Sequence, residues 1–436
     1  MNSRKIVKKI IPRKAFRKIE PYGHLAETAI YQTKGNFPAK GLKIIGVTGT
    51  NGKTTTAFMI HNMLKRAGLK VGLMTTVAYG VGDNLHPQVA HMTTVSTGLL
   101  LKRLQAMKNE GAEWIVLETT SHALAQYRVW GLKYSIAVMT NLTHEHLDYH
   151  GTFKNYRNAK VKLFKMANAN KKGLQLGIVN ADDENAKYFI KPMKNVIRYG
   201  INSGDIIAKN IQLTAAGNSY ETTANGKKIN VSCQLPGSFN VYNSLAVVAV
   251  GQALGLTKNE IEQGITTLDG VEGRMTSVNE GQDFEVIVDF AHTPDSFEKL
   301  FKDLRPVVKG RLIVMFGSAG RRDEAKRSLQ GQLAGKYADE VIITEEDDRD
   351  MDGRRIMDQI SVGAVSAGKI IGQNLFLVHN REKAIEFSLG RAKKGDSVLL
   401  LGKGHEKTIE RADGEHPWDE IGLTRKILNK ITIAKK

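Results

Sequence analysis

"GVTGTNGKTTT" (residues 46–56) stands between the apolar run 42–45 and the helical segment 57–65. A strand that enters a glycine turn and continues as a helix is typical of an α/β fold that binds phosphate. The N–H groups of the turn and the positive end of the helix dipole point at the same place. The stretch therefore predicts an α/β fold with a bound nucleoside triphosphate. A plain strand–turn–helix loop rich in glycine and threonine is the alternative interpretation.

The residue types of this loop each have a chemical use. Glycines let the backbone curl around phosphate, lysine reaches the terminal phosphates as a point charge, and the hydroxyl after it is placed to ligate Mg²⁺. The usual motif G-x-x-x-x-G-K-[ST] is shifted here, since Val47 stands at its first glycine and Gly46 lies one residue earlier. The residues expected to bind ATP in this loop are Gly49, Thr50, Asn51, Gly52, Lys53, Thr54 and Thr55.

Length and composition restrict the class of protein. A chain of 436 residues is too long for one ordinary core, so two or three domains are expected. Cys233 is the only cysteine, which excludes an internal disulfide framework and a cysteine-based metal cluster. No apolar stretch is long enough to span a bilayer, and no apolar signal core follows the basic N-terminus. We expect a cytoplasmic protein.

The formal net charge of +19 implies an anionic partner: nucleic acid, a membrane surface or a polyphosphate substrate. Part of the excess lies in residues 1–18, "MNSRKIVKKIIPRKAFRK", which contain eight Lys or Arg and no acidic residue. Ile6, Val7, Ile10 and Ile11 fall at helical spacing there. The segment predicts either a basic amphipathic arm on anionic lipid or a solvated terminus.

Short β-branched runs alternate with amphipathic segments along most of the chain, which favours parallel sheets covered on both faces. An N-terminal extension (1–42) precedes a central P-loop domain (43–271) and a Rossmann-like C-terminal domain (272–436), with a hinge at "GVEGRM" (270–275). Segment 206–231 alternates polar and apolar residues around turn signals, so antiparallel hairpins are expected there. Strands are expected at 43–47, 114–118, 135–140, 176–180, 285–289, 312–316, 340–344, 375–378 and 397–401. Helices are expected at 54–67, 98–110, 153–167, 237–256, 295–304, 324–337, 353–366 and 381–391.

Polar residues follow several expected strands, at the edge of the sheet where α/β proteins bind ligands. Glu118 ends "WIVLE", and "NLTHEHLDYH" (141–150) follows the next strand. With Thr54, Glu118 and one histidine form a plausible Mg²⁺ shell, although an imidazole is an unusual ligand for a hard cation. Spacing alone leaves His144, His146 and His150 as alternatives.

The second half repeats this arrangement three times. "DFAHTPDS" (289–296), "FGSAGRRDEAKRS" (316–328) and "LLLGKGHEKT" (399–408) each place charged residues at the end of an expected strand. Together they predict one wall of a cleft that faces the nucleotide.

These motifs, with "LETTSHALAQYRV", "TNLTHEHLDYHGTFKNYRNAK" and "GSFNVYNSLAVVA", resemble those of the Mur ligases, in the same order from about residue 43 to 420. The likeness is greatest to the branch that adds the third amino acid to UDP-N-acetylmuramyl dipeptide in peptidoglycan synthesis. It implies an ATP- and Mg²⁺-dependent amide ligase that activates a substrate carboxylate as an acyl phosphate, which an amino group then attacks.

The resemblance also implies a role for particular residues. Lys53, Glu118, His146 and Lys160 match catalytic positions, and Lys160 matches a lysine that the family carbamylates, although the residues alone do not favour Lys160 over Lys162. The implied metal ligands are Thr54, Glu118, His146 and Lys160. The implied ATP contacts outside the loop are Asn240, Asn243, Arg274 and Asp289. The implied substrate contacts are Thr93, Thr94, Ser121, Gln126 and Arg128 for the muramyl dipeptide, and Arg322, Arg349, Gly402 and Glu406 for the incoming amino acid, with His292 as a further substrate contact.

The sequence departs from the family pattern at three places. The forty or so residues before the first strand hold no counterpart of the usual uridine-binding domain, "GSAGRRDEAKRS" replaces a more glycine-rich loop, and "EDDR" (346–349) replaces Asp-Asn-Pro-Arg. Arg349 favours meso-diaminopimelate, because a guanidinium suits a distal carboxylate. The three neighbouring acids favour L-lysine instead. Of the two, we expect meso-diaminopimelate to be the amino acid that is added.

Two other functions compete with this interpretation. A related ligase that amidates or polyglutamylates another acceptor would fit the absent uridine domain. A nucleic-acid-dependent NTPase would fit the net charge, but aromatic residues are only 7% and form no stacking cluster. We therefore expect a monomeric enzyme that acts on a UDP-linked muramyl peptide and an amino acid, without nucleic acid.

Overall fold

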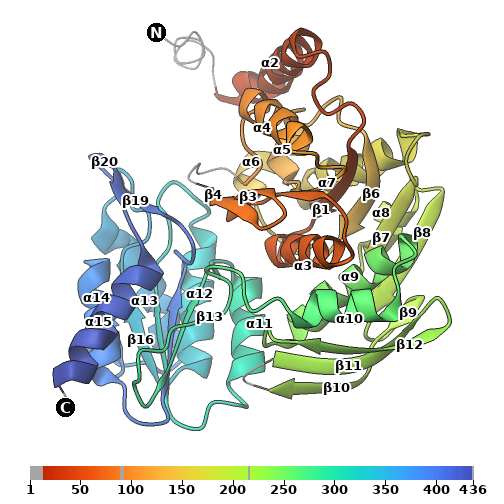
Figure 1. The fold of residues 1–436 in the computed structure, drawn as a ribbon. Helices are drawn as coiled ribbons and strands as arrows, with labels where there is room; N and C mark the ends of the chain where they lie inside the picture. Colours follow the sequence, from red (N-terminus) through yellow and green to blue (C-terminus); the bar gives the residue numbers. More distant parts are fainter. Residues whose placement is uncertain (1–12, 89–92, 215–216, 435–436) are drawn as a thin grey trace.

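Two large β-sheets organise the chain, one on either side of residue 271 (Figure 1). The structure is a computed structural model that describes residues 13–88, 93–214 and 217–434, so most of the predicted basic arm lies outside the described residues. Below, the first domain means the elements up to α10, and the second domain means those from β13 onward. Both are α/β, as the alternation of the sequence predicted.

The sheet of the first domain has nine strands in the order β4-β3-β2-β5-β1-β6-β7-β8-β9. β1 lies near the middle and pairs in parallel with β5 and β6, so the phosphate loop leaves the sheet at its centre. Only β3 and β4 run antiparallel to their neighbours. The strands are β1 (Lys43–Thr48), β2 (Val71–Met74), β3 (Ala78–Val81), β4 (Asn84–Pro87), β5 (Trp114–Glu118), β6 (Tyr134–Met139), β7 (Leu176–Asn180), β8 (Asn195–Gly200) and β9 (Ile206–Ile207).

Helices cover both faces of this sheet, which explains why its central strands are apolar throughout. Ile44 packs into a core with α4 and α7, whereas the next residue, Ile45, packs into a core with α3, α9 and α10. The helices are α2 (Arg13–Lys34), α3 (Lys53–Arg66), α4 (Thr97–Asn109), α5 (Ser121–Ala125), α6 (Leu147–His150), α7 (Phe153–Ala169), α8 (Ala186–Ile190), α9 (Ser238–Ala253) and α10 (Lys258–Thr266).

The hairpins predicted between 206 and 231 are confirmed. β10 (Lys209–Thr214), β11 (Gly217–Ala224) and β12 (Lys227–Cys233) form an antiparallel sheet. It is anchored to α9 by a hydrogen bond of 2.8 Å between the hydroxyls of Tyr220 and Ser244. This anchor brings the start of α9, with Asn240 and Asn243, toward the phosphate loop.

The second domain is built on a six-stranded sheet in the order β13-β14-β18-β15-β16-β17, in which only β13 is antiparallel. A separate two-stranded hairpin, β19–β20, stands beside it. The strands are β13 (Thr276–Ser277), β14 (Glu285–Asp289), β15 (Leu312–Phe316), β16 (Glu340–Ile343), β17 (Leu375–Leu377), β18 (Ser397–Leu401), β19 (Thr408–Arg411) and β20 (Gly414–Pro417). The helices are α11 (Pro294–Leu304), α12 (Ala325–Tyr337), α13 (Gly353–Ser366), α14 (Arg381–Arg391) and α15 (Glu420–Ala434).

Within the described part of the chain, no helix has the length and apolar character needed to cross a bilayer. The apolar segment 245–256 starts inside α9, where Leu245 to Val250 are buried against the core of the first domain.

Candidate active site

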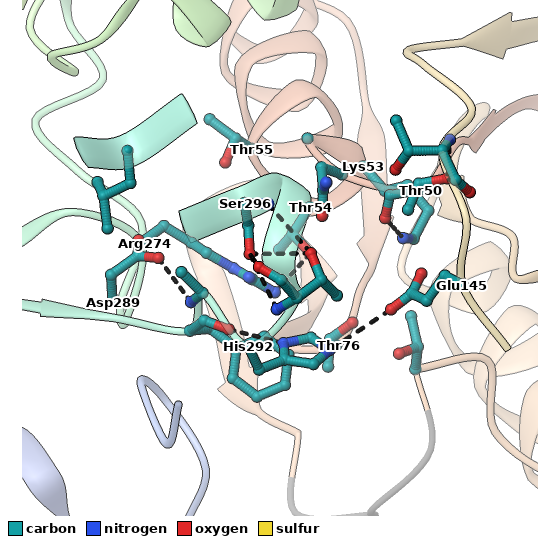
Figure 2. Close-up of a pocket in the computed structure, with 18 of the residues that line it drawn as sticks. Thr50, Lys53, Thr54, Thr55, Thr76, Glu145, Arg274, Asp289, His292 and Ser296 are labelled. Atoms are coloured by element: carbon teal, nitrogen blue, oxygen red, sulfur yellow. Dashed lines mark hydrogen bonds and ion pairs between the residues drawn. The ribbon is translucent and has the colours of Figure 1, made fainter. Parts of the chain in front are cut away.

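The phosphate loop connects β1 to α3, and Lys53 is the first residue of the helix. Gly52 has a φ of 81°, and a Cβ at this position would lie 2.3 Å from the side-chain oxygen of Asn243, so the turn requires glycine. Lys53 Nζ donates to the carbonyl oxygen of Thr50 at 2.7 Å, which folds the lysine back over the loop (Figure 2). The loop thus has the geometry that phosphate binding needs.

Glu118 ends β5 beside this loop and is 1% exposed. Its Oε2 accepts hydrogen bonds from Thr54 Oγ1 at 2.9 Å and from the backbone N–H and hydroxyl of Thr76, both at 3.0 Å. The predicted pairing of Thr54 with Glu118 is therefore present. A carboxylate and a hydroxyl are hard oxygen donors of the kind Mg²⁺ prefers.

The three histidines that spacing left as alternatives occupy different places. His144 stacks on Phe153, with ring centroids 4.5 Å apart, and His150 Nε2 lies 3.1 Å from the hydroxyl of Ser121. His146 Nε2 instead lies 3.5 Å from Glu145 Oε2. Of the three, His146 is the one that contacts the carboxylate of Glu145.

Glu145 is a negative centre close to the phosphate loop. Burial by itself would raise the pKa of Glu145, but the nearby His146, His292 and Lys53 hold that pKa well below its usual range. The carboxylate is therefore ionised at neutral pH, and it can position cationic groups or a metal-bound ligand next to Lys53.

Lys160 projects from α7 into the interior beneath the loop. Its side chain is buried, and its Nζ donates to the carbonyl oxygen of Gly49 at 2.5 Å. Burial, followed by the positive charge of Lys53, lowers the pKa of Lys160 well below the value of an ordinary lysine. Lys162 Nζ instead faces the carbonyl oxygen of Leu124 at 3.4 Å. The structure thus distinguishes two lysines that the sequence could not.

The second domain faces the loop across a cleft, and α11 brings polar groups to it (Figure 2). Asp289, at the end of β14, accepts hydrogen bonds from the N–H groups of Met275 and Ala291, both at 2.7 Å. The contacts that join the two walls include Arg274 Nη2 to Thr54 Oγ1 (3.4 Å), Asn51 Nδ2 to Asp295 Oδ2 (2.7 Å), and His292 Nε2 beside Glu145 Oε1 (3.5 Å).

The cleft between the domains has a volume of about 630 Å³, enough for a nucleotide with part of a second substrate. The predicted residues that line it are Thr50, Asn51, Gly52, Lys53, Thr54, Thr55, Thr93, Glu118, His146, Asn240, Asn243, Arg274, Asp289, His292, Arg322, Arg349 and Glu406. The predicted residues outside its lining are Gly49, Thr94, Ser121, Gln126, Arg128, Lys160 and Gly402.

Several residues outside the lining support it from behind. The hydroxyl of Thr94 donates to the carbonyl oxygen of Glu118 at 3.1 Å, and Arg128 Nη1 donates to the carbonyl oxygen of Val95 at 3.2 Å. Both residues hold segment 93–95 against the end of β5. Thr93, which lines the cleft, is held in place by these contacts.

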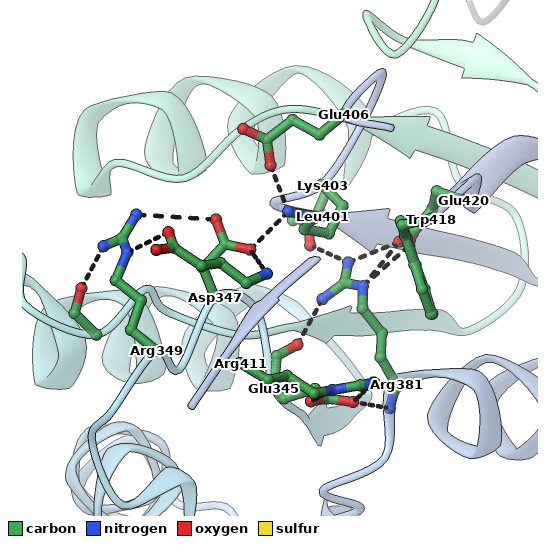
Figure 3. A network of polar contacts seen from close by, with 12 residues as sticks. Glu345, Asp347, Arg349, Arg381, Leu401, Lys403, Glu406, Arg411, Trp418 and Glu420 are labelled. Carbon is green, nitrogen blue, oxygen red and sulfur yellow. Dashed lines mark hydrogen bonds and ion pairs between the residues drawn. The ribbon is translucent and has the colours of Figure 1, made fainter. Parts of the chain in front are cut away.

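The far end of the cleft is rich in paired charges (Figure 3). Lys403, fully buried, places its Nζ 2.8 Å from Asp347 Oδ1 and 2.6 Å from Glu406 Oε2. Arg349 donates from Nε to Glu410 Oε2 at 2.7 Å and from Nη1 to the carbonyl oxygen of Gly320 at 2.5 Å. Asp347, Arg349, Glu406 and Glu410 all line the cleft, so this end can hold a molecule that carries both charge signs.

Arg381 and Glu420 form a fully buried ion pair behind this end of the cleft, with Nη2 and Oε1 2.6 Å apart. We expect Arg381→Met to lower the free energy of unfolding by about 3–5 kcal/mol, because the carboxylate of Glu420 is left buried without its partner. In urea titrations, the double variant Arg381→Met/Glu420→Met is expected to lose much less. A single variant as stable as the wild type would contradict this account.

Sequence reasoning missed two contributors to the site. Thr76 follows β2, a strand of only four residues that no periodicity reveals. Lys403 lies within the quoted "GKGHE", but its contacts to two carboxylates from different loops depend on the tertiary fold. The available signal for both residues was their position just after a strand, because ligands of α/β proteins bind at the carboxyl ends of the strands.

A P-loop whose lysine and threonine face a second α/β domain across a cleft defines an enzyme that uses a nucleoside triphosphate on a second substrate. Residues 47–251 match the family model of the Mur ligase middle domain, and residues 273–404 match that of the Mur ligase glutamate ligase domain. The chain belongs to the Mur ligase family, whose members are ATP-dependent amide ligases that use Mg²⁺.

Individual relatives agree with this assignment. The chain is 39% identical to the UDP-N-acetylmuramyl-tripeptide synthetase of Roseiflexus sp. (strain RS-1), over 90% of this chain and 80% of that protein. It is 41% identical to the UDP-N-acetylmuramoyl-L-alanyl-D-glutamate--2,6-diaminopimelate ligase of Geobacillus thermodenitrificans (strain NG80-2), over 89% of this chain and 79% of that protein. A solved structure of a ligase with the latter name has a TM-score of 0.62 and 30% identity, covering 92% of this chain and 81% of that one. The folylpolyglutamate synthase of Mycobacterium tuberculosis shares the fold, with a TM-score of 0.70 and 14% identity over 87% of this chain and 92% of that one.

Proposed function

We propose that the enzyme joins the third amino acid of the peptidoglycan stem peptide to UDP-N-acetylmuramoyl-L-alanyl-D-glutamate. The observation that carries the proposal is the single cleft in which the phosphate loop faces the two charged loops that contain Arg349 and Glu406. The names of the two relatives at 39% and 41% identity support the same substrate class.

The test is phosphate release with ATP, UDP-N-acetylmuramoyl-L-alanyl-D-glutamate and single amino acids, with the product identified by mass spectrometry. The competing acceptor is examined with folate and glutamate in the same assay. Release that requires folate, or that proceeds without the muramyl peptide, would overturn the proposal.

The residues around the loop fit Mg²⁺. Thr54 Oγ1 and Glu118 Oε2 lie 2.9 Å apart, and we propose that they hold the ion together with His146 and Lys160. The cations Lys53 and Arg274 and the buried amine of Lys160 lie near these few oxygens, so a further anionic ligand would improve the match. When bound, Mg²⁺ would neutralise charge on the phosphate oxygens of ATP.

We propose that Lys160 supplies this anionic ligand as a carbamate. Carbamate formation joins CO₂ to a neutral amine with loss of one proton, and the buried Nζ has the lowered pKa that favours the neutral amine. The product bears a carboxylate-like group in place of a cation. His146, which we propose as a further ligand, has its Nε2 3.5 Å from Glu145 Oε2.

The chain's own groups can then promote two steps. Lys53 and the N–H groups at the start of α3 stabilise the charge that develops on the phosphoryl group as the substrate carboxylate attacks it. The contacts between Arg274 and Thr54 and between Asn51 and Asp295 hold the domains together and exclude water from the acyl phosphate that results. The amino group of the incoming amino acid then displaces phosphate.

We propose Asn240, Asn243, Arg274 and Asp289 as ATP contacts, and meso-diaminopimelate as the incoming amino acid. Two nitrogens of Arg349 are occupied by Glu410 and Gly320, while Nη2 has Asp347 Oδ2 only at 4.0 Å. That nitrogen is oriented by its neighbours and can donate to a distal carboxylate. L-lysine has no such carboxylate.

We expect Arg349→Ala to lower kcat/KM for meso-diaminopimelate by about tenfold to a hundredfold, the effect of losing a charge-assisted hydrogen bond. Arg349→Lys, which keeps the charge but not the guanidinium geometry, serves as the matched control and should retain intermediate activity. Efficient use of L-lysine by the wild type, unchanged in Arg349→Ala, would show that the acidic neighbours decide the specificity instead.

Two further proposals concern partners. Both walls of the cleft come from one chain, which supports a monomeric enzyme. Residues 1–18, with their eight basic and no acidic residues, support a peripheral contact with an anionic membrane surface.

A further inference from the structure

The helix α2 packs on the first domain through only one of its sides. The hydroxyls of Thr28 and Thr97 of α4 form a buried hydrogen bond of 3.0 Å, and Gln32 Nε2 donates to the carbonyl oxygen of Trp130 at 2.9 Å. In Figure 1 the helix lies at the outer edge of the first domain, above α4 and away from the second domain. The exposure values of the described residues show which side chains the opposite side presents.

That side has the wrong composition for a solvated surface. Between residues 19 and 33, the most exposed residues of α2 are uncharged; they are Ile19, Tyr22, Gly23, Ala26, Ile30, Tyr31 and Thr33, while Glu27 is partly exposed and Lys34, which ends the helix, is exposed. A helix in contact with water normally presents charged and polar residues on its outer face. Here the outer face, which we name the α2 ridge, has Ile19 57%, Tyr22 67% and Ile30 53% exposed.

Other large apolar side chains are exposed beside the ridge. Phe37, three residues after the end of the helix, is 42% exposed, and its N–H donates to the carbonyl oxygen of Gln32 at 2.7 Å. Trp130, whose carbonyl oxygen accepts the hydrogen bond from Gln32, is 41% exposed. Six of the fifteen large apolar side chains that are exposed in the described residues thus lie on α2 or next to it. Tyrosine and tryptophan among them are the residues enriched where proteins meet the headgroup region of a bilayer.

The charge of the segment that precedes the ridge indicates what binds to the ridge. The residues that lead into the ridge, 1–18, carry eight positive charges and no negative one. An apolar helix face that follows a basic segment is typical of a peripheral lipid-binding element. In such an element, Lys and Arg bind anionic headgroups, and the apolar side chains enter the region between the headgroups and the acyl chains. A protein partner would not require so uniform a charge.

We infer that the α2 ridge is the apolar part of a surface that docks the enzyme on an anionic bilayer. The inference rests on the membrane contact proposed above for residues 1–18, but it is carried by different residues. Docking through the ridge would hold the first domain against the membrane, because α2 is fixed to α4 and to the backbone at Trp130.

The test uses the full chain and sedimentation with vesicles of phosphatidylglycerol and phosphatidylcholine, with pure phosphatidylcholine vesicles for comparison. We expect the ridge variant Ile19→Ser/Tyr22→Ser/Ile30→Ser to bind anionic vesicles at least about a hundredfold more weakly, since each inserted apolar side chain is worth roughly tenfold in partitioning. The matched control is Val362→Ser/Ile370→Ser/Ile371→Ser, whose three side chains in the second domain are 63%, 52% and 61% exposed. It should bind as the wild type does, and both variants should keep the phosphate-release activity.

A third variant separates this inference from the contact of residues 1–18. Replacing Lys5, Lys8, Lys9 and Lys14 with glutamine should weaken binding and its dependence on salt, whatever the role of the ridge. If this variant loses binding but the ridge variant binds like the wild type, the ridge inference is overturned and the basic contact stands. If the wild type does not bind anionic vesicles, both are overturned, and the ridge is left as a surface for a protein.

Discussion

Lys53→Ala is expected to lower kcat by about a hundredfold to a thousandfold, with the fold and the stability retained. Lys53 begins α3, and its Nζ donates to the carbonyl oxygen of Thr50 within the loop that we propose binds the phosphates of ATP. A charge aimed at the transferred phosphoryl group typically contributes several kcal/mol to the transition state. The measurement is steady-state phosphate release, with ATP binding followed separately.

The same helix offers a matched control for Lys53. Lys65 lies near the other end of α3 and forms an ion pair of 2.5 Å with Asp83 at the surface, so Lys65→Ala should leave the rate unchanged. Thr54→Ala should also lose most activity, whereas Thr54→Ser keeps the hydroxyl that faces Glu118 and should remain active. Wild-type rates in both Lys53→Ala and Thr54→Ala would be incompatible with a nucleotide site at this loop.

The fold could be predicted from the sequence where elements are long and apolar or strongly periodic. The segments 114–118 and 397–401 each contain a run of four apolar residues, 114–117 and 398–401, with β-branched residues among them, and both segments are strands with the expected bounds. The small strands β2, β3 and β4 could not be predicted in the same way. β3 and β4 pair at the edge of the sheet, and Asn84–Pro87 is mostly exposed, so no buried face marks it in the sequence.

The site was predictable to the extent that its residues end parallel strands or lie in the phosphate loop. Thr54 lies at the start of α3, directly after the loop that follows β1, and Glu118 ends β5, which pairs with β1, so their meeting follows from the topology of the sheet. The burial of Lys160 could not be predicted in this way, because α7 carries several lysines and only its packing against the loop decides which one turns inward. Similarly, the sequence does not reveal the partners of Arg349, because Gly320 and Glu410 lie 29 and 61 residues away from it along the chain.

The proposed carbamate on Lys160 has a second large expected effect, because the charge at this position changes sign. An ammonium beside a Mg²⁺ ion would be repelled, while a carbamate would ligate it. Lys160→Ala is therefore expected to lose nearly all turnover, and added short-chain carboxylic acids should restore part of it by occupying the vacated space with a carboxylate. Lys162→Ala is the matched control, since Lys162 lies two residues further along α7 and faces Leu124 instead.

The lowered pKa of Lys160 gives this proposal a pH dependence whose direction is fixed. Only the neutral amine reacts with CO₂, and burial with Lys53 nearby extends the neutral form to lower pH than in an ordinary lysine. As the pH falls through the lowered pKa, the amine becomes protonated and the carbamate is lost. Activity in buffers stripped of CO₂ and bicarbonate should thus decline more steeply toward low pH than activity with bicarbonate present, and bicarbonate should restore it in the wild type but not in Lys160→Ala. An active, metal-loaded enzyme whose intact mass shows an unmodified lysine, and whose rate is indifferent to bicarbonate, would refute the carbamate.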